Sequence, residues 1–399
     1  MSVTTKERFK QIARFQRPGD VMVLDWFHKT LVETPAVWVE QGAPKALLSG
    51  SMLTGNNYQL MLDYFGYDHF HTLREIISGI FRLDLLNMTE DESFYATLPI
   101  MPPFEREIIS EDEHHRVERH FGGDILKVSK KYPWRMPKYL EHPVKNRATW
   151  RDYKRRLDPN TPGRLPEEWD EYISQINSED YPNMLSLCGF FGPIRNMMGL
   201  EKTLYMFYDD PNLIEEIMEH MLQFNLEMIR KTVGAGLKVD IVMIWEDMAY
   251  KGGPLISPEM FHKFMIPRYI KLCDLIRSYG IDLIFMDSDG DINELIEPWL
   301  KVGINLHWPL EAAAGMDAVE LRKKYGSDII MIGNIDKRVF QRGEEAIRHE
   351  VMSKVPYLVE KGGYYPSIDH NIGPDIPLNG LKYYLNLLRE IGGVESLPE

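Results

Sequence analysis

Cysteine is scarce in this chain of 399 residues, since only Cys188 and Cys273 are present. Two cysteines exclude a disulfide framework and a thiolate-rich metal cluster, and they suit a reducing compartment. Long apolar runs are also missing, so we expect neither a membrane-spanning helix nor a signal sequence. Positive charge is in the minority, and the net charge of −14 disfavours nucleic acid and anionic membranes as partners. We therefore expect a cytoplasmic protein.

The chain is instead rich in short apolar runs that alternate with helical patterns. These runs lie at residues 21–26, 184–193, 238–247, 281–292, 303–309, 328–336 and 362–377. Strands that alternate with helices predict a parallel sheet with right-handed crossovers, and about eight such units form a (β/α)8 barrel. We predict an α/β fold, a TIM (β/α)8 barrel, with residues 1–399 forming a single domain.

Two regions do not follow the strand and helix alternation. Residues 4–16 predict an amphipathic helix that covers the floor of the barrel, followed by a helical, aromatic stretch over 30–81. Residues 98–165 mix short β-like runs with glycine and proline, which predicts a small antiparallel segment inserted on the barrel. In the second half, the spacing of apolar residues predicts helices at 201–208, 212–233, 257–278, 293–301, 316–325, 344–360 and 378–391.

Polar side chains stand where several of the predicted strands end. The run 281–292 ends in Asp287 and Asp289, and Glu246, His307 and His370 end other runs. In a parallel barrel the carboxyl ends of the strands meet at one face, where ligands bind. We therefore expect these side chains to gather around one point, although the two aspartates could instead cap the following helix.

Several motifs in the second half of the chain resemble the uroporphyrinogen decarboxylase superfamily. The stretches are LCGFFGPIRNMMG, KVDIVMIWEDMAY, DSDGDI, GNIDKRVF and DHNIGPDIP, and the resemblance covers roughly residues 184–391. The superfamily also contains the cobamide-dependent methyltransferases, and the motifs look closer to that branch. The resemblance implies a TIM barrel with its site at the carboxyl ends of the strands.

In the methyltransferase branch a zinc ion is bound by a His, any residue, then Cys and Gly, with a further Cys in the last loop. Setting Gly290 on that glycine places Asp287 on the His and Asp289 on the Cys, and His370 falls on the last Cys. The resemblance thus implies a site for Zn²⁺ or another divalent metal. Its ligands are oxygen and imidazole instead of thiolate.

Glu246 and His307, at neighbouring strand ends, are expected as a fourth ligand or as support for the other ligands. A harder metal site suits Lewis-acid polarisation of an ether oxygen better than activation of a thiol. We therefore predict a methyltransferase, an O-demethylase component, that moves a methyl group from a methoxyaromatic-type donor to the cobalamin of a corrinoid protein. A homodimer is compatible with the resemblance.

The predicted residues fall into two sets that overlap. Catalytic and metal-binding roles are expected for Glu246, Asp287, Asp289, His307 and His370. Aromatic walls for the methyl donor are expected from Trp26, Trp245, Trp308 and Tyr365.

Two other functions remain open. One is decarboxylation of a tetrapyrrole, although the arginine-rich segment with which true uroporphyrinogen decarboxylases bind carboxylates has no counterpart here. Near the N-terminus the chain offers only Arg14, Arg17 and Lys29. The other is a barrel that binds a corrinoid or tetrapyrrole without turning it over.

Overall fold

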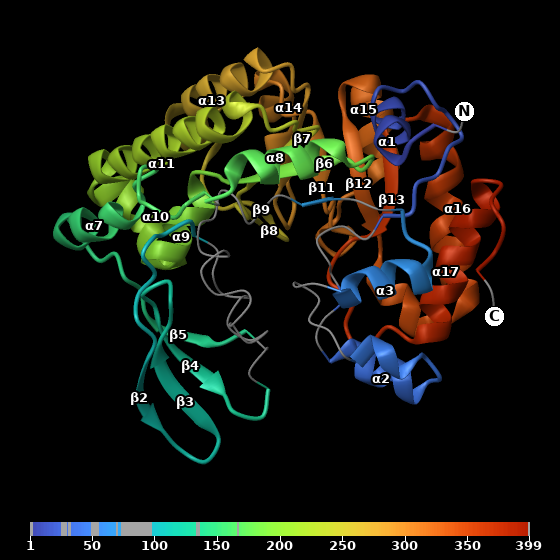
Figure 1. Ribbon diagram of the computed structural model, residues 1–399, viewed down its shortest axis with the longest axis horizontal. Coiled ribbons are helices and arrows are strands. Elements are labelled where there is room, and N and C mark those ends of the chain that lie inside the picture. The colour runs from blue at the N-terminus through green and yellow to red at the C-terminus, as the bar shows by residue number, and fades with distance from the viewer. Residues whose placement is uncertain are drawn as a thin grey trace.

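A sheet of parallel strands forms the centre of the protein (Figure 1). The computed structural model describes residues 3–24, 30, 33–48, 56–68, 71–72, 98–132, 136–165 and 167–397. Across the sheet, the strands found in these residues are β1 (His71–Thr72), β6 (Asn183–Cys188), β7 (Ile241–Trp245), β10 (Leu283–Asp287), β11 (Leu306–Trp308), β12 (Ile330–Ile335) and β13 (Tyr364–Ile368). Every neighbouring pair is parallel, so all the carboxyl ends lie at one edge.

Helices connect the strands and pack on the outside of the sheet (Figure 1). The α-helices of this half are α8 (Trp169–Ser178), α9 (Phe191–Met198), α10 (Leu200–Asp209), α11 (Pro211–Thr232), α12 (Pro258–Met260), α13 (Ile266–Ser278), α14 (Asn293–Val302), α15 (Ala318–Tyr325), α16 (Glu344–Lys361) and α17 (Leu378–Ile391). Shorter helical turns are η4 (Val233–Ala235), η5 (Phe261–Met265), η6 (Ala312–Ala314), η7 (Gly326–Asp328) and η8 (Lys337–Arg342). No helix in the described ranges is long and apolar enough to cross a membrane.

Local sequence explains where these helices begin. Ser257 caps α12 by accepting a hydrogen bond from the Met260 backbone N–H at 3.2 Å, and Pro258 occupies the first helical position. Asp210 and Pro211 play the same two roles for α11.

The strands alternate between two apolar layers, as the wall of a barrel requires. Met243, Phe285 and Leu306 belong to an interior cluster. The neighbours of Met243 and Phe285 along their strands face the helices instead. Residues 21–24 continue this alternation, because Met22 and Leu24 belong to the interior cluster and their neighbours to the outer one. A bridge from Thr30 to Ile372 is also parallel. This architecture is that of a TIM barrel.

The N-terminal helix α1 (Thr5–Ala13) lies under the barrel, at the end opposite the strands' carboxyl ends. Phe9, Ile12 and Ala13 pack into the interior cluster, and the Gly363 N–H donates to Ile12 O at 3.1 Å. The predicted covering helix is therefore present. Further along are α2 (Thr34–Glu40), η2 (Lys45–Leu48) and α3 (Asn56–Phe65), drawn in blue at the lower right of Figure 1.

A separate antiparallel sheet projects from the barrel, at the lower left of Figure 1. It consists of β2 (Glu107–Glu111), β3 (His115–Arg119), β4 (Ile125–Ser129) and β5 (Lys138–Glu141), followed by α7 (Arg147–Tyr153) and η3 (Lys154–Arg156). His142 joins the sheet to α9, because its Nδ1 lies 3.0 Å from Asp124 Oδ1 and 3.1 Å from Asn196 O. The predicted antiparallel insertion is confirmed.

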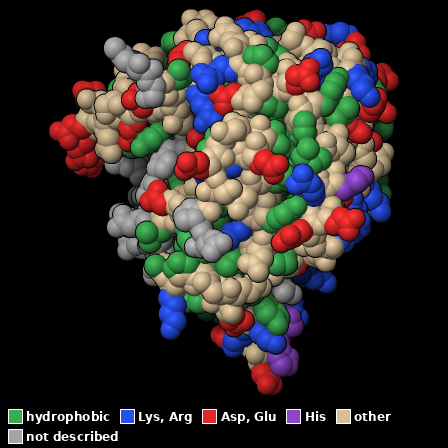
Figure 2. Space-filling model, turned by 90° about the vertical axis from the view of Figure 1, so that its right-hand side faces the viewer, with side chains coloured by type: hydrophobic (Ala, Val, Ile, Leu, Met, Phe, Trp, Pro, Cys, Tyr) green, Lys and Arg blue, Asp and Glu red, His purple; other side chains and the backbone are tan. Residues whose placement is uncertain are grey.

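Charge is mixed on the face of the protein shown in Figure 2. Basic and acidic side chains alternate there with apolar ones, with no large block of a single sign.

Candidate active site

The carboxyl ends of four adjacent strands place one row of side chains at the mouth of the barrel. Register pairs Cys188 with Trp245, Trp245 with Asp287, and Asp287 with Trp308. Trp245 and Trp308 pack with the interior cluster, and Asp287 has the parity of Leu283 and Phe285, so these three side chains face inward. The row therefore sets the carboxylate of Asp287 between two indoles, and Asp287 is only 8 % exposed.

Three carboxylates meet at this row, one of them from Asp287 itself. One oxygen each from Asp247, Asp287 and Asp289 lies within 4.8 Å of the other two. Burial raises the pKa of Asp247, and the negative charge of Asp289 raises it further, while Arg195 opposes both effects. We refer to Asp247, Asp287 and Asp289 as the acidic centre.

Oxygen spacings of this size fit the coordination shell of one divalent cation, whose ligands lie on opposite or adjacent sides of the ion. The pKa of Asp247 is raised first by burial and then by the charge of Asp289, and a bound cation would relieve the second of these effects. The donor set is entirely oxygen, which suits hard divalent ions and leaves Zn²⁺ acceptable.

His370 stands beside the acidic centre. Its Nε2 lies 3.5 Å from Asp289 Oδ2, and its Nδ1 accepts a hydrogen bond from the Asn371 backbone N–H at 2.8 Å. Because Nδ1 is the acceptor, the neutral ring carries its proton on Nε2, directed at Asp289. In this arrangement His370 supports a ligand instead of offering a lone pair to a metal.

Hydrogen bonds between loops fix the mouth. Asp369, which is 2 % exposed, accepts hydrogen bonds from the backbone N–H groups of Ala312 at 2.8 Å and Lys337 at 3.2 Å. Glu311 in turn accepts from the Gly290 N–H at 3.1 Å. The loops after β10, β11, β12 and β13 are thereby tied to one another, which preorganises the site.

Gly290 lets the loop after β10 approach the hairpin of β8 (Ala249–Tyr250) and β9 (Gly253–Pro254). Its φ is +85°, and a Cβ there would lie 2.7 to 2.8 Å from the backbone of Ala249 and Tyr250. The Asp291 N–H donates to Tyr250 O at 3.0 Å across this contact. The glycine of the DSDGD motif is thus required by both conformation and space.

The expectation for Glu246 needs correction, because its carboxylate points away from the acidic centre. Glu246 is fully buried and accepts hydrogen bonds from the backbone N–H groups of Phe190, Phe191 and Gly192 at 2.7, 2.8 and 3.1 Å. The Tyr269 hydroxyl donates to it as well. Burial raises the pKa of Glu246, and these donors oppose that rise. Its oxygens anchor the start of α9.

His307 and Tyr365 also lie away from the mouth. His307 sits between interior residues on β11, so its ring faces outward and stacks on Trp299 at 5.8 Å. Tyr365 faces inward near the floor, where its hydroxyl donates to Phe9 O at 2.6 Å. Strand alternation and depth along the strand account for both corrections. Trp26 lies outside the described residues.

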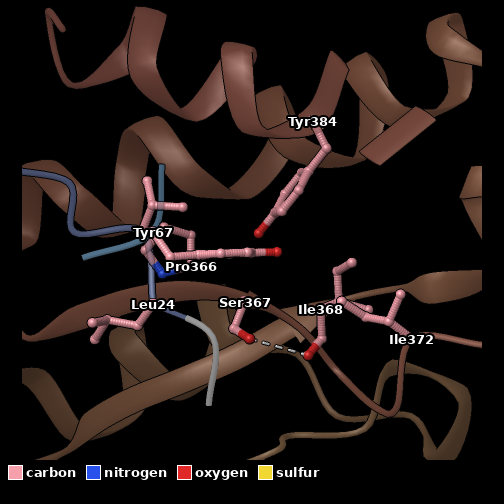
Figure 3. Close-up of a pocket in the computed structure, with 8 residues that line it drawn as sticks. Leu24, Tyr67, Pro366, Ser367, Ile368, Ile372 and Tyr384 are labelled. Atoms are coloured by element: carbon pink, nitrogen blue, oxygen red, sulfur yellow. Dashed lines mark hydrogen bonds between the residues drawn. The ribbon is translucent and has the colours of Figure 1, made fainter. Parts of the chain in front are cut away.

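A recess of about 290 Å³, with its open rim included, lies at the seam between residues 21–24 and β13 (Figure 3). Figure 3 shows the Tyr384 hydroxyl pointing into it from α17, above Pro366 and Ser367. Its lining includes no member of the acidic centre, so it is a separate feature.

The model of the family described as uroporphyrinogen decarboxylase (URO-D) matches residues 137–391. The chain belongs to the uroporphyrinogen decarboxylase family. Uroporphyrinogen decarboxylase 2, chloroplastic, from Oryza sativa is 21% identical over 243 residues, which are 57% of this chain and 59% of the rice protein. Uroporphyrinogen decarboxylase from Sulfurovum sp. is 23% identical over 195 residues, 47% of this chain and 51% of that protein. The chain thus spans between half and three fifths of these relatives.

A solved structure of similar shape is a methyltransferase from Methanosarcina mazei. It superposes with a TM-score of 0.59 at 16% sequence identity, covering 98% of this chain and 99% of the other. Identity this low supports the fold alone, so this structure confirms the predicted barrel. The predicted superfamily is confirmed by the match to the family model.

In this uroporphyrinogen decarboxylase family member, Asp247 had been expected to be functional without a metal-ligand role, and Arg195 was not predicted as a site residue. Asp247 takes the place expected for Glu246, and Arg195 on α9 binds it. The alternation of side chains along a strand indicates Asp247, since Trp245 faces inward and the residue two positions further on lies on the same side. Arg195 carries no comparable signal, because its role depends on where α9 docks.

Proposed function

We propose that this protein is a corrinoid-dependent methyltransferase that takes a methyl group from an oxygen-bound donor, such as a methoxylated aromatic compound. The acceptor is the cobalt of a corrinoid carried by a partner protein. The observation that carries the proposal is the acidic centre, whose Asp287 lies in register between Trp245 and Trp308 at the barrel mouth.

The residues of the mouth have distinct tasks in this proposal. Trp245 and Trp308 offer ring faces on which an aromatic donor can stack, and they exclude water from below. Asp247, Asp287 and Asp289 would hold a divalent cation. When bound, such a cation supplies Lewis-acid polarisation of the ether oxygen, which makes the phenolate a better leaving group. His370 keeps Asp289 oriented through its Nε2 proton.

Decarboxylation of a tetrapyrrole is the second candidate, favoured by the names of the matched relatives. A porphyrinogen carries several carboxylates and needs cations around it. Arg14 pairs with Asp282 at 3.1 Å and Arg17 with Asp20 at 2.6 Å, both at the floor of the barrel. These two arginines therefore lie at the wrong end to bind a polyanion at the mouth.

The test is methyl transfer under anaerobic conditions from methoxylated aromatic acids to reduced cobalamin, with and without added Zn²⁺ or Mn²⁺. We expect methylcobalamin and the free phenol in equal amounts, together with a divalent metal in the purified protein by elemental analysis. Asp287→Asn and Asp289→Asn should each lower the rate by at least about tenfold. Asp274→Asn, at an exposed position on α13, serves as the control.

Three outcomes would contradict the proposal. A protein that carries no metal and gains nothing from added cations rules out Lewis-acid assistance. Loss of carboxyl groups from uroporphyrinogen, without methyl transfer, establishes the decarboxylase. Tight binding of cobalamin without any turnover indicates a binding protein.

A further inference from the structure

Glu246 and Asp247 connect helix α9 to the acidic centre. Glu246 receives three backbone N–H groups at the start of this helix, and Arg195 stands one turn further along it. Gly189 makes the close approach possible, since a Cβ there would lie 2.2 Å from the Glu246 carboxyl group. The orientation of α9, and hence of Arg195, is therefore set by a residue adjacent to Asp247.

Arg195 donates hydrogen bonds to two oxygens of Asp247. Its Nη1 donates to the Asp247 backbone oxygen at 3.0 Å, and its Nη2 donates to Oδ2 of the same residue at 3.1 Å. The guanidinium also stands over the Trp245 ring, 5.6 Å from its centroid. The two Nη atoms of the planar guanidinium reach a backbone and a side-chain oxygen at a fixed spacing, whereas an ammonium offers only one nitrogen on a flexible chain.

The backbone of Asp247 has an unusual conformation, which the two hydrogen bonds from Arg195 hold in place. Its φ is +48°, in the left-handed region that residues with a side chain seldom adopt. This turn brings its carboxylate back toward the next loop, where Oδ1 lies 3.4 Å from the Asp289 backbone N. The position of Asp247 beside Asp287 and Asp289 thus depends on an unusual backbone conformation with an arginine bonded to it.

We infer that Arg195 is a positioning residue of the acidic centre: it holds Asp247 in the turned conformation that brings three carboxylate oxygens to one point. The inference rests on the proposed function in taking this centre as the place where a divalent cation binds. Glu246 contributes indirectly, by fixing the helix that carries Arg195.

If Arg195 acted through its charge alone, its removal would change cation binding in the opposite direction from that expected for a positioning residue. Arg195 places a positive charge next to the centre, so its removal should strengthen the attraction for a cation if nothing else changed. If Arg195 positions a ligand, its removal should weaken cation binding, typically by about 10- to 100-fold for a group that orients a ligand. The sign of the change therefore separates the two roles.

The experiment measures binding of Mn²⁺ alone, and then Zn²⁺ alone, to the metal-stripped full-length protein by calorimetry. We expect Arg195→Gln to weaken binding at least about tenfold. Arg195→Lys should lie between this variant and the unchanged protein, because a lysine keeps the charge and loses the second contact.

Arg106→Gln is the matched control. Arg106 has a similar side-chain exposure, 27 % against 25 % for Arg195, and it forms an ion pair with Glu118 in the antiparallel sheet instead of with a member of the acidic centre. This variant should bind cations as the unchanged protein does. Urea unfolding of each variant shows whether the chain remains folded during the titration.

Equal or tighter cation binding by Arg195→Gln overturns the inference, as does an unchanged protein that binds neither cation. Methyl transfer is assayed on the same samples, so that failure of the positioning role can be distinguished from failure of the proposed function. Cation binding that is lost in Arg195→Gln, in a protein without methyl transfer, refutes the proposed function and supports the positioning role. Methyl transfer together with unchanged cation binding in Arg195→Gln supports the proposed function and refutes the positioning role.

Discussion

Glu246 and Asp247 are adjacent in the sequence and face opposite sides of the barrel wall. Both are carboxylates at the end of a buried strand, so composition and position could predict that an acid stands at the mouth. The choice between them depends on counting the period of two outward from Trp245. Asp287 and Asp289 could be predicted as a pair for the same reason, since Asp287 has the parity of Leu283 and Phe285.

Burial of His307 predicts a dependence of stability on pH. The ring is fully buried, and its nitrogens make no hydrogen bond of normal geometry within the described residues. Burial lowers its pKa to about 3, well under the roughly 6.5 of an unfolded chain. Below about pH 6.5 the unfolded state binds a proton at His307 and the folded state does not. The free energy of unfolding therefore falls as the pH drops toward about 3.

Replacing His307 by Phe should remove this part of the acid sensitivity. Between about pH 6.5 and about pH 5, His307 alone should cost on the order of 2 kcal/mol of unfolding free energy. Urea unfolding at several pH values measures the slope, and His349→Gln on the exposed side of α16 is the control. A slope unchanged in His307→Phe would show that the buried ring is not the source.

At the scale of elements, the strands and helices of the second half could be predicted closely. The predicted helix 378–391 has the bounds of α17, and 212–233 differs from α11 by one residue at each end. Caps and apolar spacing are local signals, so they can be read without the rest of the chain. Contacts between elements are not local. The docking of the antiparallel sheet on α9 through His142 could not be predicted for that reason.

The contact between the loop after β10 and the β8–β9 hairpin can be tested at Gly290. A Cβ there would meet hairpin backbone at a distance where atoms must shift, and the φ of +85° is strained for alanine. Gly290→Ala should therefore lower the unfolding free energy by about 2 kcal/mol and weaken cation binding.

Gly252 offers the comparison within the same hairpin, because a Cβ there would meet no atom within 4 Å. Gly252→Ala should change stability by no more than about 0.5 kcal/mol. Equal effects of the two substitutions, in unfolding and in cation titration, would show that the contact does not hold the loop.

At the scale of the whole molecule, the two ends of the barrel have different tasks. The floor is covered by α1, whose Phe9 stacks on Tyr365 at 4.7 Å, and the mouth carries the acidic centre. Tyr365 was expected among the aromatic walls of the substrate site, because a residue's depth along a strand cannot be predicted from its type. Register between strands is needed for that.

Independence of the two ends predicts a simple result for Phe9→Ala. Removal of a fully buried ring should lower the unfolding free energy by about 3–5 kcal/mol. Cation affinity at the mouth should stay within about twofold, measured by calorimetry well below the unfolding temperature. A stable variant with lost cation binding would show instead that the floor controls the mouth.

The carboxylate of Glu246 at the start of α9 restricts what a substrate can be. Helix N-termini commonly receive phosphate or carboxylate groups of ligands, because their backbone N–H groups are free to donate. Here a side chain of the protein already fills that place. A negatively charged substituent therefore gains nothing from this helix, and the rim next to it is acidic as well. Under the proposed function, a methoxylated donor should therefore enter the barrel with its uncharged methoxyl end first.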